Sequence, residues 1–395
     1  MKKKDKILII TQPLRTNYGG ILQAYALQKV IRDLGFEVQT DNAFFLKPIS
    51  LKKRLKDVGA RFVYGYLKGN ENYKPLIKKQ LNRQDYEKVA KNILPFIEKN
   101  IQTIDFFENR VKPKPSNIEK FDIFICGSDQ VWRRKYGDVS RYFFDFLKNT
   151  DKKRLSYSAS FGTDNLKEYS EKEKRDCREL IKNFSAISVR ETTAIKIIEE
   201  EFKQKAVLTL DPTLLLDKEE YLKLINTAEK KAPLETTEKK KIFTYILDKS
   251  KEKEEVINIL SRRLAMRIEN IMPKKNWTAL RSKEINEEAV FPSVEKWLEE
   301  ISTADFVLTD SFHAVVFAII FNKQFLCIGN KERGLTRFTS LLDLFNLSNR
   351  LIYSKKDLTG VLLHDIYRID YKQVNQKKEE LKEISLNYLT KNLSL

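Results

Sequence analysis

The sequence is poor in cysteine and in long apolar runs, and both shortages restrict the kind of protein it encodes. Its three cysteines, Cys126, Cys177 and Cys327, are separated by 51 and 150 residues, so neither a zinc site nor a disulfide framework is expected. The longest apolar run, Ala314 to Phe321, is far too short to span a bilayer. The apolar run near the basic start of the chain stops at Thr11, too early for a secretory signal. These absences predict a cytoplasmic protein that is soluble or attached peripherally to a membrane.

Glycine motifs that bind phosphates are absent as well. No two of the 12 glycines are separated by a single residue, which excludes the G-x-G-x-x-G dinucleotide fingerprint, and no P-loop pattern occurs. No two aspartates lie two positions apart, so the chain also lacks a D-x-D pair of the kind that holds a metal and a nucleotide diphosphate. Several large enzyme classes are thereby excluded.

Positive charge is in excess, since 74 Lys and Arg stand against 55 Asp and Glu, for a formal charge of +19. Such a charge attracts polyanions, but the lysines are dispersed among glutamates and no nucleic-acid-binding motif occurs. We therefore expect no nucleic-acid partner. An anionic membrane surface suits this charge better, with Lys52, Lys53, Arg54 and Lys56 as the expected contacts.

Short apolar runs alternate with helical patterns through most of the chain. Residues 6–11 predict a strand, the apolar positions of residues 24–34 recur on one helical face, and residues 36–40 predict the next strand. This βαβ unit implies a parallel sheet. The same alternation returns at residues 121–209 and 242–328. Between the first βαβ unit and residue 121, residues 76–100 have a long helical pattern.

The fold class predicted from this pattern is α/β, with two Rossmann-like domains that face a cleft. The first domain is residues 1–210, with a helical insertion at about 47–120 in this N-terminal half. The second is residues 211–373, followed by a C-terminal helix in 374–395. The family resemblance described below makes the first domain the expected acceptor side and the second the expected donor side. Asp211-Pro212 marks the seam, because proline ends the preceding element. Forty-two per cent hydrophobic residues supply enough apolar material for two cores.

Ligands of such sheets bind at the carboxyl ends of strands, and the first two loops there suit anions and sugars. Residues 17–20 (N-Y-G-G) open a helix whose free N–H groups can hold a phosphate or carboxylate; the alternative is a plain tight turn. In residues 126–132, Asp129 and Gln130 can bind hydroxyls, and Trp132 offers a flat face for a sugar ring. The alternative there is a helix N-cap with a packed tryptophan.

Two further loops carry a cation and a histidine. Arg190 follows a strand, and its planar guanidinium suits phosphate or carboxylate; the alternative is a surface ion pair. His313 lies in the first turn of a helix, where it can act as a general acid or base or bind an anion. The alternative is a packed imidazole in a capping segment. Arg333 and Arg337 add positive charge downstream, although either one alone is typical of a solvated surface.

Taken in order, these segments resemble the polysaccharide pyruvyl transferase family. The matching pieces are residues 17–27, 127–132, 157–162, 188–191, 211–215 and 310–314. The resemblance implies a two-domain GT-B-type fold that transfers a pyruvyl group from phosphoenolpyruvate to a sugar, forming a cyclic ketal. The helical stretch from about 47 to 115 has no counterpart in it.

The resemblance also implies roles for individual residues. It places Arg190 and His313 in the donor site. Many members have an arginine two residues before this histidine, whereas here that residue is Ser311. The second cation for the donor must then come from elsewhere, and Arg333 and Arg337 are the candidates.

Ketal formation needs an acid–base group, for which His313 is the first candidate and Asp129 the second. A carboxylate beside the former enol carbon can also stabilise the positive charge that develops there. The acceptor or anion side is assigned to a set of loop residues, namely Asn17, Tyr18, Gly19, Gly20, Gln130 and Trp132. Phosphoenolpyruvate is then a co-substrate, and neither a metal nor a resident cofactor is expected.

The family's acceptors are often lipid-linked saccharides, which favours an undecaprenyl-linked precursor of an exopolysaccharide or capsule at the inner face of the cell membrane. Two alternatives stay open. A GT-B glycosyltransferase that uses a nucleotide sugar shares the fold and needs no D-x-D pair. A non-catalytic protein that binds polyanions or membranes would account for the charge alone.

Overall fold

The computed structural model describes residues 5–42, 83–108, 112–226, 240–277, 280, 285–330, 334–358 and 368–394. Two earlier assignments lie outside these residues. They are Arg333 and the basic group Lys52, Lys53, Arg54 and Lys56. Much of the insertion expected at about 47–120 also lies outside them.

The sheet of the first half has the strand order β3-β2-β1-β4-β5, and all its pairings are parallel. Its strands are β1 (Lys6–Ile10), β2 (Glu37–Asp41), β3 (Thr103–Ile104), β4 (Ile123–Cys126) and β5 (Lys153–Ser156). Two short parallel strands, β6 (Ser188–Val189) and β7 (Val207–Leu208), are linked to this layer by isolated bridges. β4 is buried at every position, as expected for a parallel strand covered on both faces.

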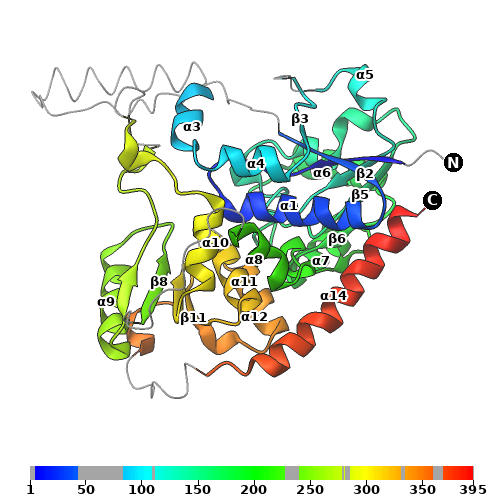
Figure 1. Cartoon of the computed structure of the whole chain (residues 1–395). Helices are drawn as coiled ribbons and strands as arrows, with labels where there is room; N and C mark the ends of the chain where they lie inside the picture. The colour runs from blue at the N-terminus through cyan, green and yellow to red at the C-terminus, as the bar shows by residue number, and fades with distance from the viewer. Residues whose placement is uncertain are drawn as a thin grey trace, which may run out of the picture.

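The second half contains another parallel sheet, with the order β12-β11-β10-β8-β9. Its strands are β8 (Lys241–Tyr245), β9 (Arg267–Glu269), β10 (Phe306–Thr309), β11 (Gln324–Ile328) and β12 (Leu351–Ile352). The predicted α/β class with two parallel sheets is therefore confirmed (Figure 1).

Helices connect and cover these strands. In the first half they are α1 (Tyr18–Asp33), α3 (Arg83–Val89), α4 (Leu94–Asn100), α5 (Pro115–Ile118), α6 (Glu171–Ile181) and α7 (Thr192–Phe202). The others are α8 (Lys218–Asn226), α9 (Lys251–Leu264), α10 (Val294–Ser302), α11 (Phe312–Ile320), α12 (Thr336–Leu344) and α14 (Tyr371–Leu393). None of the helices in the described part of the chain has the length and hydropathy that a membrane span requires.

One predicted element is corrected by the structure. The helix expected over residues 76–100 is two short helices where it is described, α3 and α4, separated at residues 90–93. Pro95 explains the break, because it lies in the first turn of α4. Proline is tolerated there, where no helical N–H bond is needed, but it would interrupt the interior of a longer helix.

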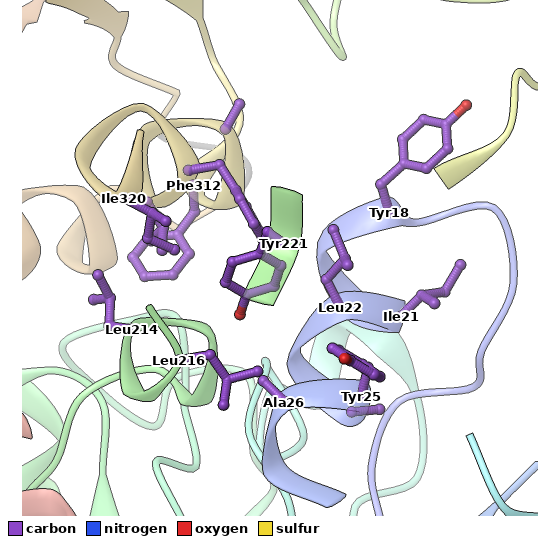
Figure 2. Packing of buried hydrophobic residues seen from close by; sticks show 14 of the residues in the cluster. Tyr18, Ile21, Leu22, Tyr25, Ala26, Leu214, Leu216, Tyr221, Phe312 and Ile320 are labelled. Atoms are coloured by element: carbon purple, nitrogen blue, oxygen red, sulfur yellow. The ribbon is translucent and has the colours of Figure 1, made fainter. Parts of the chain in front are cut away.

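The two halves share one apolar core. Tyr18 of α1 stacks on Trp297 of α10 with ring centroids 5.5 Å apart, and its hydroxyl donates to the carbonyl of Pro292 at 2.8 Å. Figure 2 shows α1 side chains facing Tyr221 of α8 and Phe312 of α11. This packing brings the N-terminal ends of α1 and α11 together.

The C-terminal helix α14 also joins the halves (Figure 1). At its start, the Tyr371 hydroxyl donates to the Ala318 carbonyl of α11. Towards its end, the Tyr388 hydroxyl donates to the Ser156 carbonyl of β5 at 2.9 Å, and the Leu210 N–H donates to the Ser385 hydroxyl at 3.0 Å. The helix thus starts on the second half and ends on the first.

Candidate active site

Asp211 is the point where loops of the two halves meet. Its Oδ2 accepts hydrogen bonds from Nη1 of Arg190 at 2.7 Å and from the Ser128 hydroxyl at 3.2 Å, and Nε2 of His313 lies 3.5 Å away. Its Oδ1 accepts from the N–H and the hydroxyl of Thr213. Burial raises the pKa of this carboxyl, but His313 and Arg190 outweigh burial and hold it well below its ordinary value. Asp211 is therefore a buried carboxylate that links Arg190 to His313.

From the sequence, Asp211 was placed at the seam between domains and in a segment that resembles the family, but it was given no role in the site. A signal existed, because Asp211 comes shortly after the end of β7, and the carboxyl ends of parallel strands are where ligands bind. Pro212 beside it indicated a break in secondary structure and nothing more.

Arg190 is buried beside two carboxylates rather than paired at the surface. Its Nη2 lies 3.5 Å from Oδ1 of Asp129, and its guanidinium carbon lies 4.4 Å from the centre of the Phe312 ring. Burial lowers the pKa of Arg190, but Asp211, Asp129 and Glu191 together raise it, so the group stays charged. Among the described residues, its buried Nε and Nη2 have no hydrogen-bond acceptor. Buried donors without acceptors are costly, which is the condition expected of a site that receives an anion.

Asp129 is an ionised carboxylate in this cluster. Its backbone has φ of +81°, a region that costs energy for any residue but glycine and that is often found at functional sites. Its Oδ1 accepts from the N–H of Gln130 at 2.8 Å, and Nδ2 of Asn17 lies 3.5 Å from Oδ2. Burial raises the pKa of Asp129, whereas Arg190 and His313 lower it by more.

His313 is held against the first turn of α1. A Cβ atom added to Gly19 would lie 2.1 Å from Cγ of His313, so the ring occupies the space that a side chain at residue 19 would need. Among the described residues Nε2 of His313 has no hydrogen-bond partner, although Asp211 lies within 3.5 Å. The ring is thus fixed in place by packing, with one nitrogen directed towards the buried carboxylate.

Two helix N-termini open beside these residues. The N-cap residues Asn17 of α1 and Ser311 of α11 make no side-chain capping bond within the described structure. First-turn N–H groups lack partners inside the helix, and they attract anions together with the helix dipole. The predicted anion-binding role of residues 17–20 is therefore compatible with their place in the structure.

The family of the chain follows from comparison with known proteins. A family model described as polysaccharide pyruvyl transferase matches residues 17–332, a range that contains Asn17, Asp129, Arg190, Asp211 and His313. The chain belongs to the polysaccharide pyruvyl transferase family. No curated protein matches it.

Solved structures agree with a GT-B fold for this pyruvyl transferase family member. The glycotransferase of kitacinnamycin matches with a TM-score of 0.51 and 10% identity, over 99% of this chain and 100% of that chain. S. aureus MnaA bound to UDP matches with a TM-score of 0.49 and 14% identity, over 99% and 97% of the two chains. A UDP-GlcNAc 2-epimerase from Neisseria meningitidis matches at 0.45 and 11%, over 96% and 94%. At these identities the likeness concerns the fold alone, and it rests on the match with a TM-score above 0.5.

The residue that departs from the family pattern, Ser311, has a cation nearby. Arg337 of α12 is buried, and its guanidinium carbon lies 5.3 Å from the centre of the Phe312 ring, which Arg190 also contacts. Burial and the charge of Arg190 lower the pKa of Arg337 to about 10. Of the two candidates for the second donor cation, Arg337 lies beside the site and Arg333 lies outside the described residues.

Glu191 was not predicted, and it holds a loop of the site in place. Its Oε1 accepts hydrogen bonds from the Ser160 hydroxyl and from the N–H groups of Phe161 and Gly162. Burial raises the pKa of this carboxyl. Gly162 has φ of +66° and lies so close to Gln130 that an added Cβ would be 2.1 Å from its Oε1. Glu191 thereby fixes the position of Gln130 through this loop.

Two predicted acceptor residues are corrected. Trp132 is fully buried, stacks on Phe143 at 5.2 Å and donates its ring N–H to the carbonyl of Tyr142, so it has no face open to a sugar. Tyr18 is equally buried in the core between the halves. Trp132 was predicted to offer its face to a sugar and Tyr18 to belong to an anion-binding turn, but aromatic side chains next to a strand end are also the largest available core material.

Proposed function

We propose that the protein transfers the pyruvyl group of phosphoenolpyruvate to two hydroxyls of a saccharide, with release of phosphate. The observation that supports this most is Arg190, a buried guanidinium with two donor nitrogens that have no acceptor among the described residues. Arg337 adds a second buried cation beside the same ring, and two uncapped helix N-termini lie nearby. A donor with both a phosphate and a carboxylate suits such a site.

The reaction balances with the groups at hand. A proton is added to the methylene carbon, the neighbouring carbon becomes positively charged, and the first hydroxyl oxygen bonds to it. The bond from that carbon to the phosphate oxygen then breaks, and the second hydroxyl closes the ketal. Two hydroxyl protons are lost; one replaces the proton given to the methylene carbon, and the other leaves with phosphate.

His313 is the group proposed to move the proton, since it is the site's imidazole and faces a fixed carboxylate. Asp129 is assigned to the positive carbon, because a carboxylate whose pKa is lowered stabilises charge better than it accepts protons. Arg190 and Arg337 are assigned to the phosphate and the carboxylate of the donor. The proposed acceptor is a lipid-linked saccharide precursor, and the basic chain would then work at the inner face of a membrane.

The test is incubation of the purified protein with phosphoenolpyruvate and a panel of methyl hexopyranosides, with phosphate release and product mass as readouts. Phosphate release that depends on the sugar supports the proposal. Transfer from nucleotide sugars only, with no phosphate from phosphoenolpyruvate, would replace it with a glycosyltransferase.

A matched pair of variants locates the chemistry. Arg190→Lys keeps the charge but loses the planar fork, and we expect kcat/KM to fall by about 100-fold. Arg178→Lys is the control, because Arg178 bonds the Glu201 carbonyl on the outside of α6 and α7. Equal activity in both variants would remove Arg190 from the site.

A further inference from the structure

The loop that follows Gln130 presents an exposed aromatic ring. Tyr136 ends a short 3₁₀ turn, η2 (Arg134–Tyr136), and is 43% exposed. Most aromatic side chains of this loop region, including Trp132 and Phe143, are buried. The ring of Tyr136 is therefore accessible to a ligand.

Neighbouring side chains hold the turn in one conformation. Arg134 bonds both the carboxylate of Glu173 and the carbonyl of Gly137. The N–H of Lys135 donates to Oε2 of Glu168 at 2.8 Å. The ring of Tyr136 is therefore presented by a fixed backbone, and little conformational entropy is lost when a ligand binds to it.

The ring is also connected to the donor site. Nε2 of Gln130 lies 3.4 Å from the Tyr136 hydroxyl, and Gln130 directly follows Asp129. On its other side, Oε1 of Gln130 lies 3.1 Å from where a Cβ of Gly334 would be, three residues before Arg337. Tyr136 thus lies at the outer edge of the same cluster of residues.

The cation–π contact of Arg133 supports the ring. Its guanidinium carbon lies 5.3 Å from the centre of the Tyr136 ring, and its Nη1 donates to Oε1 of Gln130 at 3.0 Å. A tyrosine combines an apolar face with a polar tip, and a pyranose ring combines apolar C–H faces with hydroxyls at its edge. Binding sites for such ligands pair an aromatic surface with a few placed polar groups.

We propose that Tyr136 and Gln130 form the acceptor subsite, in which the ring of Tyr136 stacks on the C–H face of a pyranose. Gln130 binds a sugar hydroxyl, and the reacting hydroxyls extend towards Asp129 and His313. This inference rests on the proposed function for the reaction that follows, but sugar binding can be measured without it. It also assigns to Tyr136 the stacking role that the buried Trp132 cannot perform.

The experiment compares Tyr136→Ala with Tyr136→Phe, which keeps the ring. Saturation-transfer NMR with methyl hexopyranosides measures binding on the wild type and both variants. Tyr353→Ala is the matched control, because Tyr353 is another exposed tyrosine and its ring lies next to Gly329. We expect transfer to the ring C–H protons in the wild type, Tyr136→Phe and Tyr353→Ala, and its loss in Tyr136→Ala.

Where turnover is measurable, Tyr136→Ala should raise the acceptor KM by about two- to tenfold, as loss of one aromatic contact predicts, and leave the KM for phosphoenolpyruvate unchanged. The subsite is overturned if Tyr136→Ala still binds the saccharide. It is also overturned if the wild type binds no hexopyranoside. Sugar binding that depends on Tyr136 without phosphate release would instead keep the subsite and reject the proposed function.

Discussion

At the scale of single residues, the candidate site is a set of buried, closely packed charged side chains. Arg190 and Arg337 lie over the same Phe312 ring, although like charges repel at short range. Asp129 and Asp211 offset that repulsion, and the donor nitrogens of Arg190 without acceptors remain for a ligand. The site therefore holds its cations in place before a substrate arrives, which is the arrangement that favours electrostatic catalysis.

Gly19→Ala tests the contact between α1 and His313. The new methyl group would lie 2.1 Å from Cγ of His313, so the imidazole must move. We expect kcat/KM for phosphate release to fall by about 100-fold and stability to drop by about 1–3 kcal/mol. Arg32→Ala is the control, because Arg32 is exposed in the last turn of the same helix, far along α1 from Gly19. Equal losses in both variants would contradict a specific role for Gly19.

Asp211→Asn tests the buried ion pair through pH. The pKa of Asp211 is held below its ordinary value, so its carboxylate stabilises the fold fully above about pH 4 and progressively less as pH falls below that. We expect the variant to lose about 3–5 kcal/mol at pH 7, because it removes the closer of the two carboxylates that pair with the buried Arg190. The difference between wild type and variant should shrink as pH is lowered from 5 to 3 in urea titrations. A difference that is constant with pH would show that Asp211 titrates as an ordinary aspartate.

At the scale of elements, helix ends and one long helix determine the site. α1 and α11 bring two uncapped N-termini together, and α14 packs across both halves. The apolar face of α14 ends in Leu389 and Leu393, which are nearly fully buried. This contact holds the first half against the second at some distance from the chemistry.

Leu389→Ala tests that contact. Removing a buried leucine side chain costs about 2–5 kcal/mol, and thermal unfolding should show a correspondingly lower Tm. Ile384→Ala on the same helix is the control, because Ile384 is 51% exposed and its truncation should change little. If both variants melt alike, α14 does not pack as described.

At the scale of the whole molecule, the relevant features are the apolar core that both halves share and the excess of positive charge. The core that contains Tyr18, Trp297 and Phe312 extends through both halves. The short distance between Asp211 and His313 therefore depends on both halves being packed together. The charge of +19 exceeds what the site uses. We propose that the remainder attracts an anionic membrane surface rather than nucleic acid.

Vesicle binding tests this assignment. Each basic residue near an anionic leaflet contributes about 1 kcal/mol, and salt weakens the attraction. We expect the protein to sediment with vesicles of phosphatidylglycerol but not of phosphatidylcholine, and to be released by salt. Neutralising Lys52, Lys53, Arg54 and Lys56 together should reduce binding at least several-fold. Unchanged binding by that variant would place the contact elsewhere, and salt-resistant binding to unrelated DNA would favour the polyanion alternative.

Local patterns predicted much of this fold. The apolar runs at residues 6–11 and 36–40 predicted β1 and β2 to within one residue, and the helical face of residues 24–34 predicted α1. Gly35, with φ of +96°, follows the end of that helix in the left-handed conformation that glycine adopts most readily. The single helix expected over residues 76–100 was wrong. The helical pattern of the sequence continues through Pro95, whereas the backbone helix is interrupted between α3 and α4. Such signals succeed because strand and helix periods depend on neighbours in sequence.

Local patterns and motifs were enough to predict two parallel α/β halves, the family, and the positions of Asp129, Arg190 and His313 after strand ends. The folding of the chain settled which groups share the site. It placed Asp211 and Arg337 there, and it buried Trp132. Periodicity indicates which positions face inwards, but burial and charge pairing depend on side chains more than a hundred residues apart, and those meet only when the chain is folded.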